Sequence, residues 1–276
     1  MKILYILLFL SISLSQTDST KISVWKNDVI STLNYTNTSF DNWVAGGEDA
    51  YTWQLDILAH FNLDKTDFNW SNTVKLSYGK TKVGDLEAKK TSDEIKLESV
   101  YTYKLGTTIN PYIATTGQTQ FSKSYDYKVL PKTEISTYLD PAYFTQSIGV
   151  GYSTSDELKT RFGFSIKETI ATQFLNFTDD ATTTKIEDIR VDYGAELVAD
   201  LNKMVSENIR YSSKIEFFSD FSGIKYVDVS FDNLFSAKVS DFISVSFNYK
   251  ITYDRDIHVK RQIKKILAAG VTYSFL

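Results

Sequence analysis

The stretch Ile263–Leu276, IKKILAAGVTYSFL, decides the fold that the sequence predicts. Its odd positions from 265 to 275 are mostly apolar and end in two aromatic residues, Tyr273 and Phe275, whereas its even positions are mostly small or polar. A period of two is typical of a strand whose two faces meet different surroundings. The stretch therefore indicates an amphipathic terminal strand.

Eleven earlier segments alternate in a similar way, although the first is weaker and the fifth has no clear face and is placed by elimination. Short connections between segments alternate with longer ones, as in barrels that cross a membrane with up-and-down strands. A soluble β-sandwich is the alternative, but it would not carry so many charges on the second face of its strands. We therefore predict an all-β fold, a membrane-spanning antiparallel up-and-down β-barrel of about twelve strands. The twelve segments are 29–35, 51–61, 68–78, 94–105, 109–121, 144–152, 162–166, 189–197, 209–217, 227–235, 243–253 and 263–276.

The spacing of Gly270, Tyr273 and Phe275 resembles the terminal insertion signal of bacterial outer-membrane barrels. The resemblance implies residence in the bacterial outer membrane, contact with its lipid, and recognition of the C-terminal strand by the barrel assembly machinery. An even strand number with short periplasmic turns would place both termini on the periplasmic side.

Residues 1–15 have the pattern of a secretory signal peptide. Lys2 precedes an apolar run from 3 to 10, and Ser13 and Ser15 are small residues before the expected cleavage site. A membrane anchor is the alternative, but the run is too short to cross about 30 Å of hydrocarbon as a helix. We expect residues 16–276 to form the barrel domain.

The composition of the chain excludes several kinds of binding and metal site. The chain has 276 residues and no Cys, which excludes disulfides and Cys-ligated metals, and its net charge of -4 argues against general nucleic-acid binding. The two histidines, His60 and His258, are predicted at opposite ends of the barrel, so they would not share a metal site. No catalytic residue, cofactor or metal is predicted, and we do not expect an enzyme.

The second faces of the strands carry charges of both signs, which a barrel would turn toward its lumen. Buried charges must be paired or hydrated, so they form either a structural lattice or a polar pathway for solutes. Acids slightly outnumber bases in this set, so a pore would weakly favour cations. The candidate lumen-lining residues are Asp56, Lys75, Glu94, Lys96, Glu98, Lys104, Arg190, Asp192, Glu196, Asp200, Arg210, Lys214, Glu216, Asp228, Asp232 and Lys250.

The eighth and ninth segments suggest a specific register. A tight turn at residues 202–204 would set opposite charges against each other, and opposite-charge cross-strand pairs contribute about 0.2–1 kcal/mol. The pairs expected from this register are Arg190 with Glu216, Asp192 with Lys214, and Glu196 with Arg210.

A motif follows the first segment: Asn42, Trp43, Gly46 and Gly47 form an Asn-Trp-x-x-Gly-Gly element. In this element the chain resembles an uncharacterised family of outer-membrane barrels from the Bacteroidota, a domain-of-unknown-function family. The resemblance implies a barrel and its location but no activity. The two glycines permit a tight reversal, and whether the motif is a structural turn or a ligand patch stays open.

The predicted function is a channel or transport-related pore for small polar solutes. A non-conducting structural or surface-recognition barrel is the main alternative, and a barrel enzyme is the third. A channel requires a continuous wet lumen, a scaffold predicts a lumen blocked by salt bridges, and an enzyme requires a His near a nucleophile.

Overall fold

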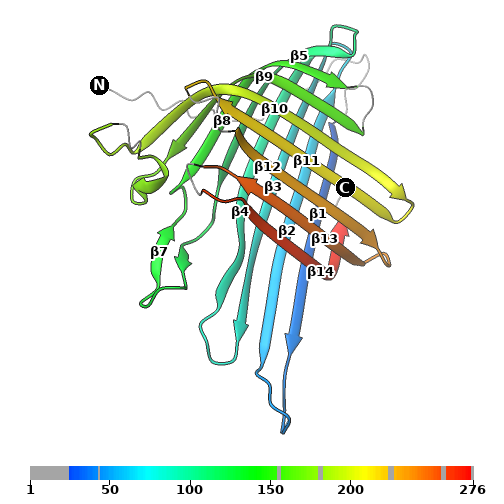
Figure 1. Ribbon diagram of the computed structural model, residues 1–276. Coiled ribbons are helices and arrows are strands. Elements are labelled where there is room, and N and C mark those ends of the chain that lie inside the picture. The colour runs from blue at the N-terminus through cyan, green and yellow to red at the C-terminus, as the bar shows by residue number, and fades with distance from the viewer. Residues whose placement is uncertain are drawn as a thin grey trace, which may run out of the picture.

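The computed structural model describes residues 25–42, 44–153, 157–179, 183–222, 227–255 and 259–274. Twelve antiparallel strands form one closed barrel, which β1 and β14 complete by pairing with each other (Figure 1). The predicted fold class and strand number are confirmed, and each predicted segment overlaps one strand. Phe275 and Leu276, at the end of the last predicted segment, lie outside the described residues. The barrel strands are β1 (Trp25–Thr38), β2 (Ala50–Asp64), β3 (Phe68–Val83), β4 (Lys89–Tyr103), β5 (Ile109–Thr119), β8 (Ala142–Ser153), β9 (Leu158–Ile170), β10 (Ile189–Ser206), β11 (Ile209–Asp220), β12 (Val227–Lys238), β13 (Ile243–Tyr253) and β14 (Gln262–Ser274).

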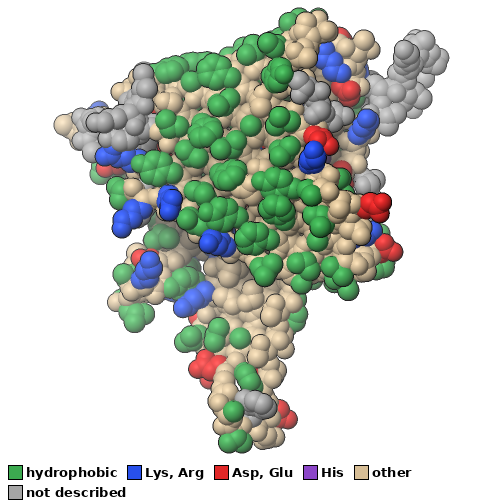
Figure 2. Space-filling view, turned by 45° about the vertical axis from the view of Figure 1, so that its right-hand side comes forward, with side chains coloured by type: hydrophobic (Ala, Val, Ile, Leu, Met, Phe, Trp, Pro, Cys, Tyr) green, Lys and Arg blue, Asp and Glu red, His purple; other side chains and the backbone are tan. Residues whose placement is uncertain are grey.

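The outer wall of the barrel is apolar. Large side chains at alternate strand positions remain exposed there, including Ile113 at 56%, Phe162 at 57% and Leu267 at 76%. Figure 2 shows hydrophobic side chains spread over much of one face of the barrel. A monomeric soluble protein rarely exposes an apolar surface of this extent, so the wall is suited to lipid.

The two ends of the barrel differ. Connections of few residues, such as 65–67 and 207–208, lie at one end, which we call the short-turn end; β1 begins and β14 ends there. Longer connections, such as 39–49, 120–141 and 171–188, lie at the other, the long-loop end. In the described chain no helix has the length and apolar character needed to cross a membrane. A 3-10 turn, η1 (Leu175–Phe177), lies in one of the long connections.

A small second sheet, which the sequence did not predict, lies within the connection between β5 and β8. It consists of β6 (Ser124–Asp126) and β7 (Thr133–Ser136) and stands to the side of the β3–β4 hairpin (Figure 1). Lys132 holds it to the hairpin through an ion pair with Glu87, and Lys89 lies over the Tyr127 ring. The β1–β2 hairpin projects farther from the barrel.

The glycine motif occupies the tip of the β1–β2 hairpin. Gly46 and Gly47 have φ values of 82° and 139°, and Asn42 is also left-handed at 53°. A Cβ on Gly47 would lie 2.5 Å from Cζ of Phe40, so only glycine fits against that ring. Trp43 lies outside the described residues.

The predicted register of the eighth and ninth segments is wrong. β10 continues to Ser206 and the hairpin turns at residues 207–208 instead of 202–204. The expected pairs were each worth too little to fix the register. Lys214 and Glu216 bond across the lumen to β4 instead. The structure places Asp200 opposite Lys214, Val198 opposite Glu216, Met204 opposite Arg210 and Phe218 opposite Glu196.

Candidate functional site: a charge network across the barrel lumen

Inward strand positions bring a set of charged side chains together inside the barrel. They occupy the strand face opposite the exposed apolar residues, so the alternation that builds the outer wall also places them. We call this set the crossing network. Its members are Lys75 on β3; Glu94, Lys96 and Glu98 on β4; Arg161 on β9; Glu196 and Asp200 on β10; Lys214 and Glu216 on β11; Asp232 on β12; and Lys250 on β13.

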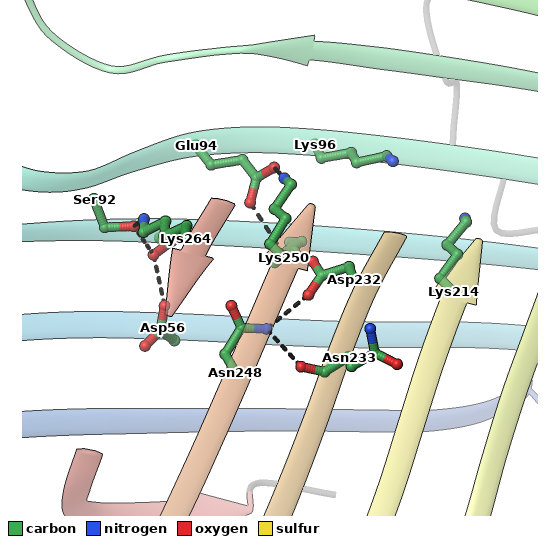
Figure 3. A network of polar contacts seen from close by, with 12 residues as sticks. Asp56, Ser92, Glu94, Lys96, Lys214, Asp232, Asn233, Asn248, Lys250 and Lys264 are labelled. Atoms are coloured by element: carbon green, nitrogen blue, oxygen red, sulfur yellow. Dashed lines mark hydrogen bonds and ion pairs between the residues drawn. The ribbon is translucent and has the colours of Figure 1, made fainter. Parts of the chain in front are cut away.

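The first part of the network joins β3 and β4 to β12 and β13. Lys75 Nζ lies 3.2 Å from a Glu94 oxygen and 2.9 Å from an Asp232 oxygen, and Lys250 Nζ lies 3.0 Å from Glu94. Asn248 donates to Asp232 over 2.6 Å (Figure 3). Because β13, β14, β1 and β2 separate β12 from β3 around the barrel, the Lys75–Asp232 contact crosses the lumen.

The second part joins β4 to β10 and β11. Lys96 Nζ lies 2.9 Å from Glu216, and Lys214 pairs with Glu98 and lies 3.4 Å from Glu216. Lys214 also lies 3.9 Å from Asp200, its cross-strand neighbour. Four strands, β10, β9, β8 and β5, separate β11 from β4, so the Lys96–Glu216 and Lys214–Glu98 contacts also cross the lumen.

Arg161 extends the second part to β9. Its Nη2 lies 2.6 Å from Glu98 and its Nε lies 3.2 Å from Glu196. The buried Glu196 also accepts a hydrogen bond from Ser147 over 2.7 Å and one from the Tyr112 hydroxyl over 3.4 Å. The arginine therefore shares its charge between two carboxylates, and the hydroxyls of Ser147 and Tyr112 hold one of them, Glu196, in place.

Two glycines make room for the ring that lies beside this arginine. Gly149 and Gly163 lie opposite each other on β8 and β9, and a Cβ on Gly163 would lie 2.8 Å from the Tyr112 hydroxyl oxygen. Tyr112 covers this bare backbone, and the Arg161 guanidinium lies 5.9 Å from its ring centroid. An aromatic ring packed over glycines is a common way to stabilise such a strand pair.

Further ion pairs lie outside the crossing network. Lys167 on β9 contacts both Asp228 and Asp254 at 2.8 Å. Arg190 and Asp192 pair with each other along β10 at 3.0 Å, instead of with the predicted Glu216 and Lys214.

The remaining candidates have other surroundings. Asp56 accepts hydrogen bonds from Ser77 and Gln54, and Lys104 pairs with Asp64 at the short-turn end, where Arg210 is exposed. His60 lies 3.1 Å from the Thr73 hydroxyl, whereas His258 lies outside the described residues. Within the part of the chain that the structure describes, no group of three or more His, Cys, Asp or Glu side chains could hold a metal ion.

Sequence reasoning missed three lumen cations, Arg161, Lys167 and Lys264. The first two alternate with Phe162, Phe164 and Ile166 on β9, so the period of two was enough to find them. With these cations and Asp254, the second partner of Lys167, included, the slight acidic excess of the predicted set disappears. The lumen charges are therefore close to balanced.

Residues 35–125 match the model of a family described as a protein of unknown function (DUF3078), a range that includes the Asn42–Gly47 motif. No curated protein matches the sequence.

Among solved structures, the chain is similar to the translocator domain of the autotransporter NalP from Neisseria meningitidis, with 9% identity, 94% of this chain and 90% of that chain covered, and a TM-score of 0.41. It is also similar to an outer membrane channel from Pseudomonas putida F1, with 9% identity, coverage of 93% and 96%, and a TM-score of 0.39. A third similar structure is the NanC porin, with 8% identity, coverage of 90% and 97%, and a TM-score of 0.37.

Proposed function

We propose that this protein is a pore of the bacterial outer membrane for small polar solutes, closed at rest by the crossing network. The observation that carries the proposal is a polar lumen crossed by direct ion pairs, inside a wall whose outer surface is apolar. Direct contacts of 2.9 Å between opposite walls leave no passage where they lie. A solute would pass only when these pairs separate.

The pairing pattern favours a closure that can open. Lys214 on β11 also contacts Glu216, and Glu98 on β4 also contacts Arg161, so the Lys214–Glu98 pair across the lumen can separate while each charge keeps another partner. An unpaired charge in a low-dielectric site is costly, so exchange between shared partners lowers the barrier to opening.

The proposed topology places the short-turn end and both chain termini in the periplasm and the long loops outside the cell. The amphipathic terminal strand supports insertion by the barrel assembly machinery, and residues 1–15 would be removed during export. The apolar wall supports direct contact with outer-membrane lipid.

Conductance in planar bilayers tests the pore. The informative variant replaces both members of one bridging pair, Lys96→Ser with Glu216→Ser, which leaves the net charge unchanged and removes the side chains from the crossing point. We expect rare or small openings for wild type and larger, longer openings for the variant. The matched control is Lys104→Ser with Asp64→Ser, because this ion pair lies at the short-turn end and outside the crossing network.

A non-conducting barrel is the second candidate, and the same bridging pairs favour it. Its outer hairpins, above all β1–β2, would then present a surface to partners. If neither wild type nor the Lys96/Glu216 variant conducts in correctly folded barrels, the pore is excluded and the scaffold remains. A conductance gain that the Lys104/Asp64 control shares would also contradict closure by the crossing network.

A further inference from the structure

One lumen cation differs from the members of the crossing network. Each lysine and arginine of that network has at least one carboxylate within 4.0 Å, but Lys264 on β14 has none among the described residues. Its Nζ donates instead to the hydroxyl of Ser92 on β4, over 3.2 Å (Figure 3). Since β1, β2 and β3 lie between β14 and β4, the Lys264 side chain points into the lumen.

The Ser92 hydroxyl that accepts this hydrogen bond also belongs to a chain of hydrogen bonds that leads to Asp56. Ser77 donates to Asp56 over 2.6 Å, and the Ser92 and Ser77 hydroxyls lie 2.7 Å apart. Because each hydroxyl has one proton, Ser92 must donate to Ser77 and accept from Lys264. Both serines are buried, so the chain of bonds from Lys264 to Asp56 is fixed in direction.

This arrangement leaves donors on Lys264 available. An ammonium group has three N–H donors, and the Ser92 contact uses one. The residue is exposed, in contrast to the half-buried Lys250. In addition, Lys250 lies directly opposite Lys264 in the β13–β14 pair, and like charges in this position destabilise a sheet unless an anion compensates them. Glu94 compensates Lys250, whereas Lys264 lacks such a partner among the described residues.

We propose that Lys264, positioned by Ser92, forms a binding site for a small organic anion with a single carboxylate. The role of this site rests on the proposed pore: a solute would bind at Lys264 in the lumen before the crossing network opens. The ligand carboxylate accepts hydrogen bonds from the two remaining N–H groups of Lys264. Its negative charge offsets the repulsion between Lys250 and Lys264.

The surrounding charges favour a monoanion over a dianion. The largest electrostatic influences on Lys264 come from Glu94, Lys250, Lys75 and Asp56, and two of these four groups are carboxylates. A second negative charge on the ligand would meet their repulsion in a lumen where screening is weaker than in bulk water. Acetate should therefore bind better than phosphate at a pH where phosphate is a dianion.

The test is an NMR titration of the folded full chain in detergent micelles, with sodium acetate added at constant ionic strength. We expect saturable shifts at Lys264, Ser92 and their neighbours, and about tenfold or more weaker binding in Lys264→Gln, because hydrogen bonds to charged groups contribute about 1.5–3 kcal/mol. Lys264→Arg should retain binding. Lys238→Gln is the matched control, an exposed lysine whose ion pair with Asp241 lies at the short-turn end.

The readout is equilibrium binding, so it separates this site from the pore. Saturable acetate binding in a barrel that never conducts would retain the site and remove the pore. The absence of saturable shifts in wild type would overturn the site, and so would shifts that persist in Lys264→Gln or phosphate binding tighter than acetate. In each of these cases, conductance of the Lys96/Glu216 variant would still support the pore.

Discussion

At the scale of single residues, depth along the barrel decides the cost of a charge on the outer wall. Leu97 lies near the middle of β4 and is 49% exposed, whereas Leu105, at 60%, follows the end of that strand in a connection at the short-turn end. Both side chains are accessible, but only Leu97 would face hydrocarbon in a membrane-embedded barrel.

This contrast gives a prediction for one substitution at two depths. Leu97→Arg should destabilise the folded barrel by about 2–4 kcal/mol, and Leu105→Arg by about 0–1 kcal/mol, because the penalty for a cation falls toward the interface. Reversible unfolding from lipid vesicles in denaturant measures both. Equal costs at the two positions would contradict a membrane midplane at the level of Leu97.

Asp140 shows how one carboxylate orders two long loops. It accepts hydrogen bonds from the Thr172 hydroxyl at 2.8 Å and from the amides of Thr172, Gln173 and Phe174 at 3.0, 2.8 and 3.3 Å. Burial acts to raise the pKa of Asp140, but these hydrogen bonds outweigh it and lower the pKa below its ordinary value. The charged form is therefore the one that holds the loops together.

The direction of this pKa shift sets a pH dependence. A carboxyl whose folded pKa is lowered contributes stability above its unfolded pKa of about 4, and this contribution is lost as the pH falls through the folded pKa. Asp140→Asn should reduce the hydrogen-exchange protection of the Thr172, Gln173 and Phe174 amides by about tenfold at neutral pH. The difference from wild type should shrink as the pH falls from about 4 through the lowered folded pKa, below which the wild-type carboxyl is also neutral. A difference that stays constant down to pH 2 would show that the Asp140 charge is not responsible.

At the scale of elements, the β10–β11 hairpin shows what sets a strand register. The hairpin has a bulge between Met204 and Ser206, and its turn follows directly. Several of its inward charges bond to β4 and β9, among them Lys214 to Glu98 and Glu196 to Arg161. Contacts from other walls of the barrel therefore contribute to the register together with the turn.

Cross-linking distinguishes this register from the one that charge pairing along the hairpin suggested. The chain has no native Cys, so double Cys variants report single pairs. Ala199→Cys with Ile215→Cys should form a disulfide under mild oxidation, because these residues are direct neighbours. Val191→Cys with Ile215→Cys should remain reduced, since Val191 lies eight positions along β10 from Ala199, the true partner of Ile215. A non-reducing gel of the folded barrel measures both, and the opposite pattern would reinstate the register expected from the sequence.

At the scale of the whole molecule, the lumen has nearly balanced charge, and this changes the expected ion selectivity. The candidate residues taken from the sequence suggested a weak preference for cations. Arg161, Lys167 and Lys264 add positive charge that this set lacked. An opened pore should therefore discriminate little between cations and anions.

Reversal potentials across a salt gradient check this prediction. The Lys96→Ser/Glu216→Ser variant should give a value near zero. Adding Asp228→Asn and Asp232→Asn should shift it toward anion selectivity, because Lys167 and Lys75 each lose one carboxylate partner. The shift should weaken at high salt, as the Debye length falls from about 10 Å at 0.1 M to about 3 Å at 1 M. Adding Asp241→Asn alone, at the β12–β13 turn, should have little effect. A strong cation preference that survives the Asp228/Asp232 change would contradict control by these charges.

The sequence by itself determined the architecture of this protein. Each strand alternates apolar and polar positions, and the number of such segments, with their alternating short and long connections, gave a closed barrel of twelve strands. Even the fifth strand, which has no clear face, was placed by elimination, because its neighbours left one position for it. These features are local in sequence, so the period-two pattern of apolar residues is enough to predict them.

Only the tertiary structure decided which charges meet. Lys75 and Asp232 are 157 residues apart, and their contact depends on the closure, tilt and register of all the strands between them. Each cross-strand or ionic pair contributes little alone, so no pair can be chosen from the sequence, and the Asp192–Lys214 prediction failed for this reason. The closing of the barrel brings distant walls within reach, and with them the crossing network and the accessible Lys264.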